Sequence, residues 1–131
     1  MTPEAEAYLA KAREDLEDAR EILRIHLAKV AARSAYYAAF HAAEALIIER
    51  TGRVAKTHSG VRAAFARLWL NASQADRSAP TFLAHAYRLK EIGDYGVGQG
   101  ALVTDDEAHE AVEGAAKFIA SVSALLTRGP P

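Results

Sequence analysis

The run from Val30 to Glu49 constrains the fold of this chain more than any other part of the sequence. It contains no glycine and no proline, and eight of its twenty residues are alanine, so it predicts a helix. Its large apolar residues do not keep to one stripe, since Tyr37 and Ile48 fall on one side of that helix and Phe40 falls on another. A helix that is apolar nearly all round is buried nearly all round. We therefore expect this helix at the centre of the fold.

Three polar side chains interrupt this apolar run. Arg33, Tyr37 and His41 are spaced four residues apart, which aligns them along one face of the helix. They could form a pocket in which the arginine binds a phosphate and the tyrosine or histidine bonds to or stacks on a base. Alternatively, Tyr37 and His41 are core residues with satisfied hydrogen bonds, and Arg33 pairs with Glu44 or a carboxylate of the first helix.

The composition is that of an ordinary globular domain of 131 residues, half of them apolar and a quarter charged. This length suits a single domain over residues 1–131. No cysteine is present, which excludes disulfide bonds, thiolate metal sites and a cysteine nucleophile. We see no secretory signal, and no apolar run approaches the roughly 18 residues of a membrane span. A cytoplasmic protein without membrane contact is expected.

The charges are unevenly distributed around a net charge of −1. A near-neutral chain does not bind nucleic acid by bulk electrostatics. However, the segment 50–75 has no acidic residue and five basic ones: Arg50, Arg53, Lys56, Arg62 and Arg67. We expect this segment to present a basic patch.

Four further helices are expected around the central one. They are an amphipathic helix from Pro3, a third helix after Gly60, a fourth from Ser78 and a last one after the capping box Thr104–Glu107, while the central helix ends at Gly52. A single helix over residues 3–50 would span about 70 Å, so we place a turn near His26–Lys29. The glycine-rich stretch 93–100 is expected to be a loop, with Asp94 and Tyr95 folded back onto Arg88. The sequence predicts an all-α fold, an antiparallel bundle of about five helices.

The segment Lys56–Ser59 precedes the third helix. Free N–H groups, the helix dipole, hydroxyl groups and a lysine together suit a phosphate there. The alternative is an ordinary helix cap made by Thr57 or Ser59. The five histidines of the chain show no metal-ligand spacing, so neither a metal nor a cofactor is expected.

Two blocks in this order, Arg33–Ala43 and Lys56–Val61, resemble the small stand-alone HEPN domain proteins of bacteria and archaea. Arg88 and the stretch Gly93–Gly96 extend the resemblance over nearly the whole chain. It implies a compact helical bundle that commonly dimerises and that is linked to RNA or nucleotides. It also implies a frequent partner, a minimal nucleotidyltransferase, in a pair of the toxin–antitoxin type.

The chain departs from this family's ribonuclease motif, an arginine followed after four to six residues by a histidine. Arg88 is followed by Asp94 where a histidine would stand. The literal spacings Arg20/His26 and Arg53/His58 are about as many as chance predicts, and spacing alone is weak support. The catalytic candidates are His41, Arg88 and Asp94, and the candidates for binding nucleotide or RNA are Arg33, Tyr37, His41, Arg53, Lys56, Thr57, His58, Arg88 and Tyr95.

Three functions stay open at this point. The first is a HEPN-like module with a degenerate ribonuclease motif that binds RNA or nucleotide and pairs with a nucleotidyltransferase. The second is an active, metal-independent ribonuclease with a histidine as general acid or base. The third is a non-catalytic dimerisation or interaction module. A homodimer is expected in addition, with Trp69 as an exposed anchor of its interface.

Overall fold

The computed structural model of this protein describes residues 1–73, 76–98, 100 and 102–128. This part of the chain holds five helices and no strand, which confirms the predicted all-α class. The helices are α1 (Pro3–Arg24), α2 (Ala28–Thr51), α3 (His58–Ser73), α4 (Ser78–Tyr95) and α5 (Asp105–Thr127).

Helix α2 lies at the centre and packs against each of the other four helices. All eight alanines of its Val30–Glu49 run are buried, so the neighbouring helices approach its backbone closely. The prediction of a central, nearly all-round buried helix is confirmed. Gly52 ends α2 with a φ of 71°, the left-handed conformation that glycine adopts at no steric cost.

The turn between α1 and α2 covers residues 25–27, one residue ahead of the predicted position. His26 has a φ of 62°, which reverses the chain without a glycine. Its Nδ1 atom lies 3.2 Å from Asp105 Oδ2 at the start of α5. This contact ties the turn to the last helix.

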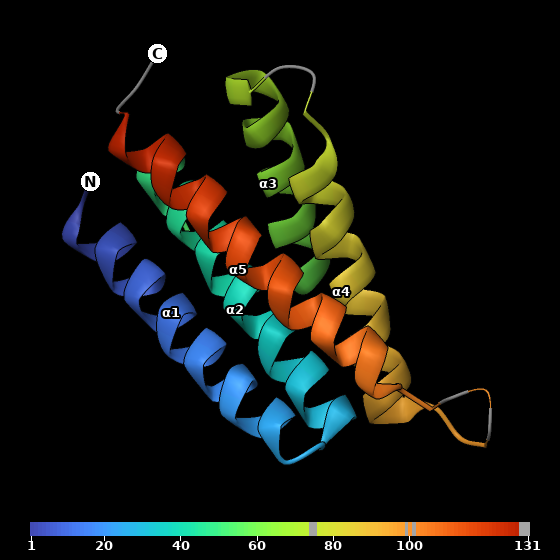
Figure 1. Cartoon of the computed structure of the whole chain (residues 1–131). Helices are drawn as coiled ribbons and strands as arrows, with labels where there is room; N and C mark the ends of the chain where they lie inside the picture. Colours follow the sequence, from blue (N-terminus) through green and yellow to red (C-terminus); the bar gives the residue numbers. More distant parts are fainter. Residues whose placement is uncertain (74–75, 99, 101, 129–131) are drawn as a thin grey trace.

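Helices α2 and α3 run in the same general direction, whereas α1/α2, α3/α4 and α4/α5 are antiparallel pairs (Figure 1). His58, the first residue of α3, lies beside Phe40 in the middle of α2, at 4.6 Å between ring centroids. Arg67, further along α3, shares a pocket with Thr51 at the end of α2. The connection 52–57 therefore returns along α2 before α3 begins, and this return brings His58 to the aromatic residues of α2.

Two local expectations are wrong. Asp94 and Tyr95 belong to the last turn of α4 and not to a loop. Gly93 in this turn lies close to Lys29, at 3.1 Å from an ideal Cβ to Lys29 Cβ. Trp69 is buried and is no exposed anchor: its ring stacks on Phe65 at 5.5 Å. Its Nε1 donates a hydrogen bond to the Asp76 carbonyl at 3.1 Å.

Candidate functional site

Six rings gather where α2, α3 and the inner face of α4 meet, and we call them the aromatic–histidine cluster: Tyr36, Tyr37, Phe40, His41, His58 and Tyr87. Tyr36 is fully buried and lies 5.8 Å from His58 and 5.4 Å from Tyr87, measured between ring centroids. Phe40 stacks on His58 at 4.6 Å and also lies 5.7 Å from Tyr36, measured between ring centroids. The cluster thus fixes the orientation of the His58 imidazole.

The hydrogen bond from Tyr36 defines the chemistry of His58. The Tyr36 hydroxyl lies 2.7 Å from His58 Nδ1. Burial raises the pKa of Tyr36, so the hydroxyl keeps its proton and can donate to Nδ1. Burial, followed by the positive charges of Lys90 and Arg62, lowers the pKa of His58. His58 is therefore a neutral imidazole at neutral pH, and the tautomer that accepts from Tyr36 carries its proton on Nε2.

Two cationic side chains, Arg62 of α3 and Lys90 of α4, lie against rings of the cluster. The Arg62 guanidinium lies 3.8 Å above the Tyr87 ring, and the Tyr87 hydroxyl donates to Glu91. Lys90 is buried, with its Nζ 3.1 Å from Asp94 Oδ2. Burial by itself lowers the pKa of Lys90, but the hydrogen bond with Asp94 and the neighbouring negative charges outweigh it and raise the pKa. Lys90 thus carries its charge in a mostly buried position.

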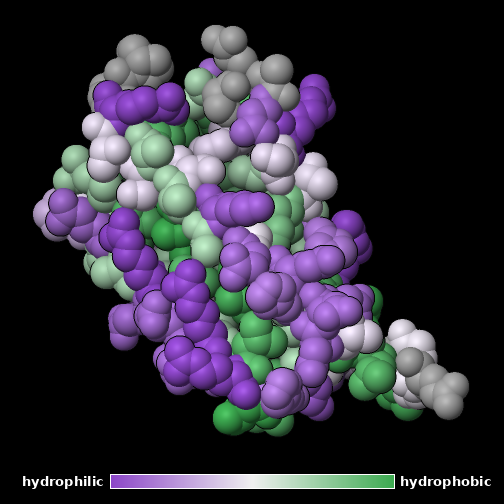
Figure 2. All heavy atoms as spheres, viewed as in Figure 1, coloured by the Kyte–Doolittle hydropathy of each residue, from purple (hydrophilic) through white to green (hydrophobic). Residues whose placement is uncertain are grey.

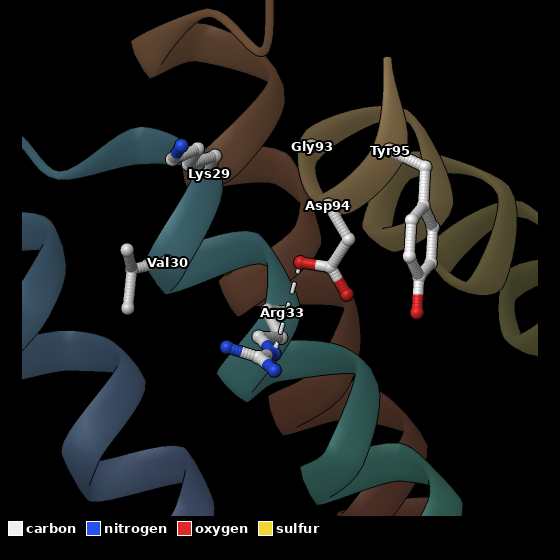
Figure 3. Close-up of a pocket in the computed structure, with 6 residues that line it drawn as sticks. All are labelled: Lys29, Val30, Arg33, Gly93, Asp94 and Tyr95. Atoms are coloured by element: carbon white, nitrogen blue, oxygen red, sulfur yellow. Dashed lines mark ion pairs between the residues drawn. The ribbon is translucent and has the colours of Figure 1, made fainter.

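A pocket of about 320 Å³ opens next to this cluster, and we call it the α2–α4 pocket. It is lined by Lys29, Val30 and Arg33 from α2 and by Gly93, Asp94 and Tyr95 from α4. Figure 3 shows the Asp94 carboxylate between the Arg33 side chain and the Tyr95 ring. Arg33 Nε lies 3.7 Å from Asp94 Oδ1, yet the arginine side chain is 55% exposed. The pocket therefore presents exposed positive charge beside an exposed aromatic ring.

His41 points to α1 and not into this pocket. Its Nδ1 lies 2.7 Å from Glu44 Oε1, and its Nε2 lies 3.5 Å from Asp15 Oδ2. Burial raises the pKa of Asp15 although the charge of His41 acts in the opposite direction. Of the two interpretations of His41, this geometry agrees with the one in which its hydrogen-bond partners lie within the fold and not in a ligand. The carboxylate partner of Arg33 is Asp94 of α4, and not Glu44 or an acid of the first helix.

The segment before α3 forms an ordinary cap. The Gly60 N–H donates to Thr57 Oγ1 at 2.9 Å, so one of the N–H groups that a phosphate would use is occupied. Arg53 and Lys56 are exposed in the connection 52–57. Arg53 lies with Arg67 at a different pocket from that of Arg33.

Arg88 is exposed on α4 and forms no ion pair with any residue that the structure describes. Asp94 follows six residues later, which places it about 120° away around the helix. The structure does not bring these two motif residues together. The expected contact of Asp94 with Arg88 is wrong, because Asp94 pairs instead with Arg33 and Lys90.

Several residues of the site were not among the candidates from the sequence: Lys29, Tyr36, Tyr87, Lys90 and Glu91. Arg62 was expected only as part of the basic patch. Tyr87, Lys90, Glu91 and Asp94 stand at positions i, i+3, i+4 and i+7, the signal of one helix face. This signal was available, but assigning Asp94 to a loop interrupted it. Lys29 carried no such signal, because only the packing of α2 on the end of α4 places it there.

No three histidine, aspartate or glutamate side chains in the described part of the chain are arranged to hold a metal ion. None of the described helices is long and apolar enough to cross a membrane.

A central alanine-rich helix packed against four further helices defines the class of this protein as an all-α helical bundle. The model of the HEPN domain family matches residues 5–125, and this chain belongs to that family. The resemblance noted in the sequence is confirmed.

Several known proteins are similar to this chain. A UPF0332 protein of Thermotoga maritima is 32% identical over 91 residues, which cover 70% of this chain and 68% of that protein. A UPF0332 protein of Archaeoglobus fulgidus is 34% identical over 99 residues, 72% of this chain and 74% of that protein. The crystal structure of TT1696 from Thermus thermophilus superimposes with a TM-score of 0.76 at 26% identity, covering 95% of this chain and 99% of that one.

Proposed function

We propose that this HEPN domain binds RNA or a nucleotide in the α2–α4 pocket. One observation carries the proposal: exposed Arg33 and Lys29 lie in the same pocket as Tyr95, a residue that is 73% exposed. A guanidinium binds phosphate through charge-assisted hydrogen bonds. An exposed aromatic ring stacks on unpaired bases. The pocket thus offers a contact for each part of a nucleotide.

The charge balance of the pocket supports an anionic ligand. Among the described residues that line it, Asp94 is the only acid, and Lys90 already contacts this carboxylate at 3.1 Å from the buried side. Arg33 and Lys29 therefore contribute positive charge that Asp94 does not cancel. The Arg33–Asp94 distance of 3.7 Å is longer than a strong hydrogen bond, so Arg33 can turn to a phosphate at little cost.

Fluorescence anisotropy with a labelled single-stranded RNA tests this function. Arg33→Gln and Tyr95→Ala should each weaken binding about tenfold, in line with about 1–3 kcal/mol for a stacked base or a charged hydrogen bond. Arg20→Gln is the matched control, because Arg20 is exposed on α1 and pairs only with Glu17. Unchanged affinity in both pocket variants would contradict the proposal.

We propose that the protein binds RNA but does not cleave it with the arginine–histidine motif of the family. Arg88 points to solvent, while the Asp94 oxygens face Arg33 and Lys90. The two residues therefore do not converge on one scissile phosphate. Metal-independent cleavage of RNA by the purified protein that is lost in Arg88→Ala would favour the ribonuclease alternative.

We also propose, as membership of this family suggests, that the domain is one half of a toxin–antitoxin type pair with a minimal nucleotidyltransferase. The test is co-expression with a nucleotidyltransferase encoded beside its gene. A complex that stays together in size-exclusion chromatography is expected. Separate elution of the two proteins at micromolar concentration would count against the pair.

A specific feature of the surface supports a second candidate function, self-association. Large exposed apolar side chains occur in the α1–α2 turn, at the end of α4 and in the α4–α5 connection: Ile25, Leu27, Ile92, Val97 and Leu102. Both connections lie at the same end of the bundle (Figure 1), and Figure 2 shows hydrophobic surface there. We call this set the apolar end. It replaces Trp69 as the proposed contact of a homodimer.

A further inference from the structure

We propose that a second pocket, formed by α3 and the C-terminal part of α2, holds another phosphate of the same RNA, so that a single strand lies along α2. This inference rests on the proposed RNA binding. It adds the path of the RNA strand over the protein and the minimum length of that strand. We call the second site the α2–α3 pocket. Its volume is about 430 Å³.

The α2–α3 pocket combines two arginines with an apolar floor. Arg53 from the connection 52–57 and Arg67 from α3 line it together with Ile47, Val54 and Ala64. Two guanidinium groups at one pocket suit a phosphate, which can accept hydrogen bonds from both. The apolar floor suits the less polar face of a sugar or base.

The backbone at Arg53 is held in place by its neighbours. Gly52 turns the chain out of α2 with a φ of 71°. Thr51 Oγ1 then donates to the Ile47 carbonyl at 2.8 Å and accepts from the Arg53 N–H at 3.1 Å. The starting point of the Arg53 side chain is thus fixed at the edge of the pocket.

No carboxylate of the described chain neutralises this pair of arginines. Neither Arg53 nor Arg67 forms an ion pair with a described residue, and no acidic residue occurs between positions 50 and 75. Glu49, the acid nearest in sequence, accepts a hydrogen bond from the Thr2 N–H at 2.8 Å. Positive charge without a partner in the fold is available to an anionic ligand.

The two pockets lie on the same face of α2. Arg33 of the first and Thr51 of the second are eighteen residues apart, which is five complete turns and roughly 27 Å. Glu44 lies between them but is only 8% exposed and is hydrogen-bonded with His41 at 2.7 Å, so its carboxylate presents little surface to a passing phosphate chain. At about 3.4 Å per nucleotide in a stacked strand, this distance corresponds to roughly eight nucleotides.

The test compares oligouridylates of two and of ten nucleotides by fluorescence anisotropy at low salt. The wild-type chain should bind the longer RNA at least about tenfold more tightly. The Arg53→Gln/Arg67→Gln variant should lose this gain from length and keep the affinity for the dinucleotide. The matched control is Arg20→Gln/Arg77→Gln, which removes two exposed arginines that line neither pocket.

The possible failures are distinguishable. If Arg33→Gln weakens binding but Arg53→Gln/Arg67→Gln leaves the length dependence intact, the second pocket is overturned and the proposed function stands. If the wild-type chain binds neither RNA, the proposed function fails and this inference fails with it. Circular dichroism checks that each variant keeps its helical content.

Discussion

At the scale of single residues, the environment of His58 determines its chemistry. The Tyr36 hydroxyl lies 2.7 Å from Nδ1, and Phe40 covers one face of the ring. Burial disfavours the charged imidazolium, and the nearby Lys90 and Arg62 disfavour it further. The lowered pKa of His58 therefore has a structural cause that is present only in the folded chain. As a result, the free energy of unfolding depends on pH.

Stability should rise with pH as His58 loses its proton. The folded-state pKa lies below the ordinary value of 6.5, so between the two values the unfolded chain binds more protons than the folded chain. The contribution of His58 is fully present above pH 6.5 and is lost as the pH falls through the folded-state pKa. Urea unfolding of the wild type and of His58→Gln between about pH 5 and 7.5 measures it. A stability difference between them that does not change with pH would contradict this assignment.

The neighbouring tyrosines should respond differently to loss of their hydroxyl groups. Tyr36→Phe should lower the free energy of unfolding by about 1 kcal/mol, because the hydrogen bond to His58 is lost. Tyr37→Phe should change it little, because its hydroxyl has no hydrogen-bond partner among the described residues. Equal losses in the two variants would refute this distinction.

At the scale of elements, the close contact of α4 with α5 depends on one glycine. A Cβ atom built on Gly114 of α5 would lie 2.2 Å from Phe82 Cε1 of α4. The Phe82 ring is supported by Phe118 at 6.1 Å between centroids. In a helix, alanine is more favourable than glycine by about 1 kcal/mol. At position 114, however, an alanine would fit only if the Phe82 ring moved away.

Gly114→Ala should therefore destabilise the protein by about 1–3 kcal/mol, the usual cost of overpacking. In the Phe82→Ala background the same substitution should instead stabilise by up to about 1 kcal/mol, because the obstacle is gone. Urea unfolding of the four proteins of this cycle checks both signs. A stabilising Gly114→Ala in the wild-type background would refute the proposed contact.

The elements themselves were largely predictable from the sequence, because their signals are local. The alanine run, the Gly52 cap and the capping box Thr104–Glu107 act within a few residues, and each is found where it was expected. The end of α4 was not predictable, because its glycine-rich sequence indicates a loop, whereas the close packing of Gly93 on Lys29 becomes visible only in the fold. Trp69 was misplaced for the same reason, since its stacking partner and its hydrogen-bond partner become visible only in the fold.

At the scale of the whole molecule, the candidate site results from the path of the chain. The return of the connection 52–57 along α2 brings His58 to Phe40, and the packing of α4 on α2 brings Tyr95 to Lys29 and Arg33. Contacts of this kind join residues that are distant in sequence, so they cannot be predicted from residue spacing. The sequence could name Arg33, His58 and Tyr95, but not which of them share a pocket.

The apolar end should make the protein a homodimer. Val97 and Leu102 are 95% and 73% exposed, and burying such side chains favours association by roughly 25 cal/mol per Å². Light scattering should give twice the 14.1 kDa mass of one chain at micromolar concentration. Val97→Glu/Leu102→Glu should restore the mass of one chain, while His85→Glu/His109→Glu, at two exposed positions outside the apolar end, should not. The mass of a single chain for the wild type would refute the dimer.

The central claim, that Lys29 and Arg33 bind phosphate, is tested most directly by the salt dependence of RNA affinity. Each phosphate contact on a single strand contributes about −0.7 to the slope of log K against log salt concentration. We predict that Lys29→Gln/Arg33→Gln makes this slope shallower by about 1.4 between about 50 and 200 mM salt. A slope identical to that of the wild type, at whatever affinity, would show that neither residue contacts a phosphate and would contradict the claim.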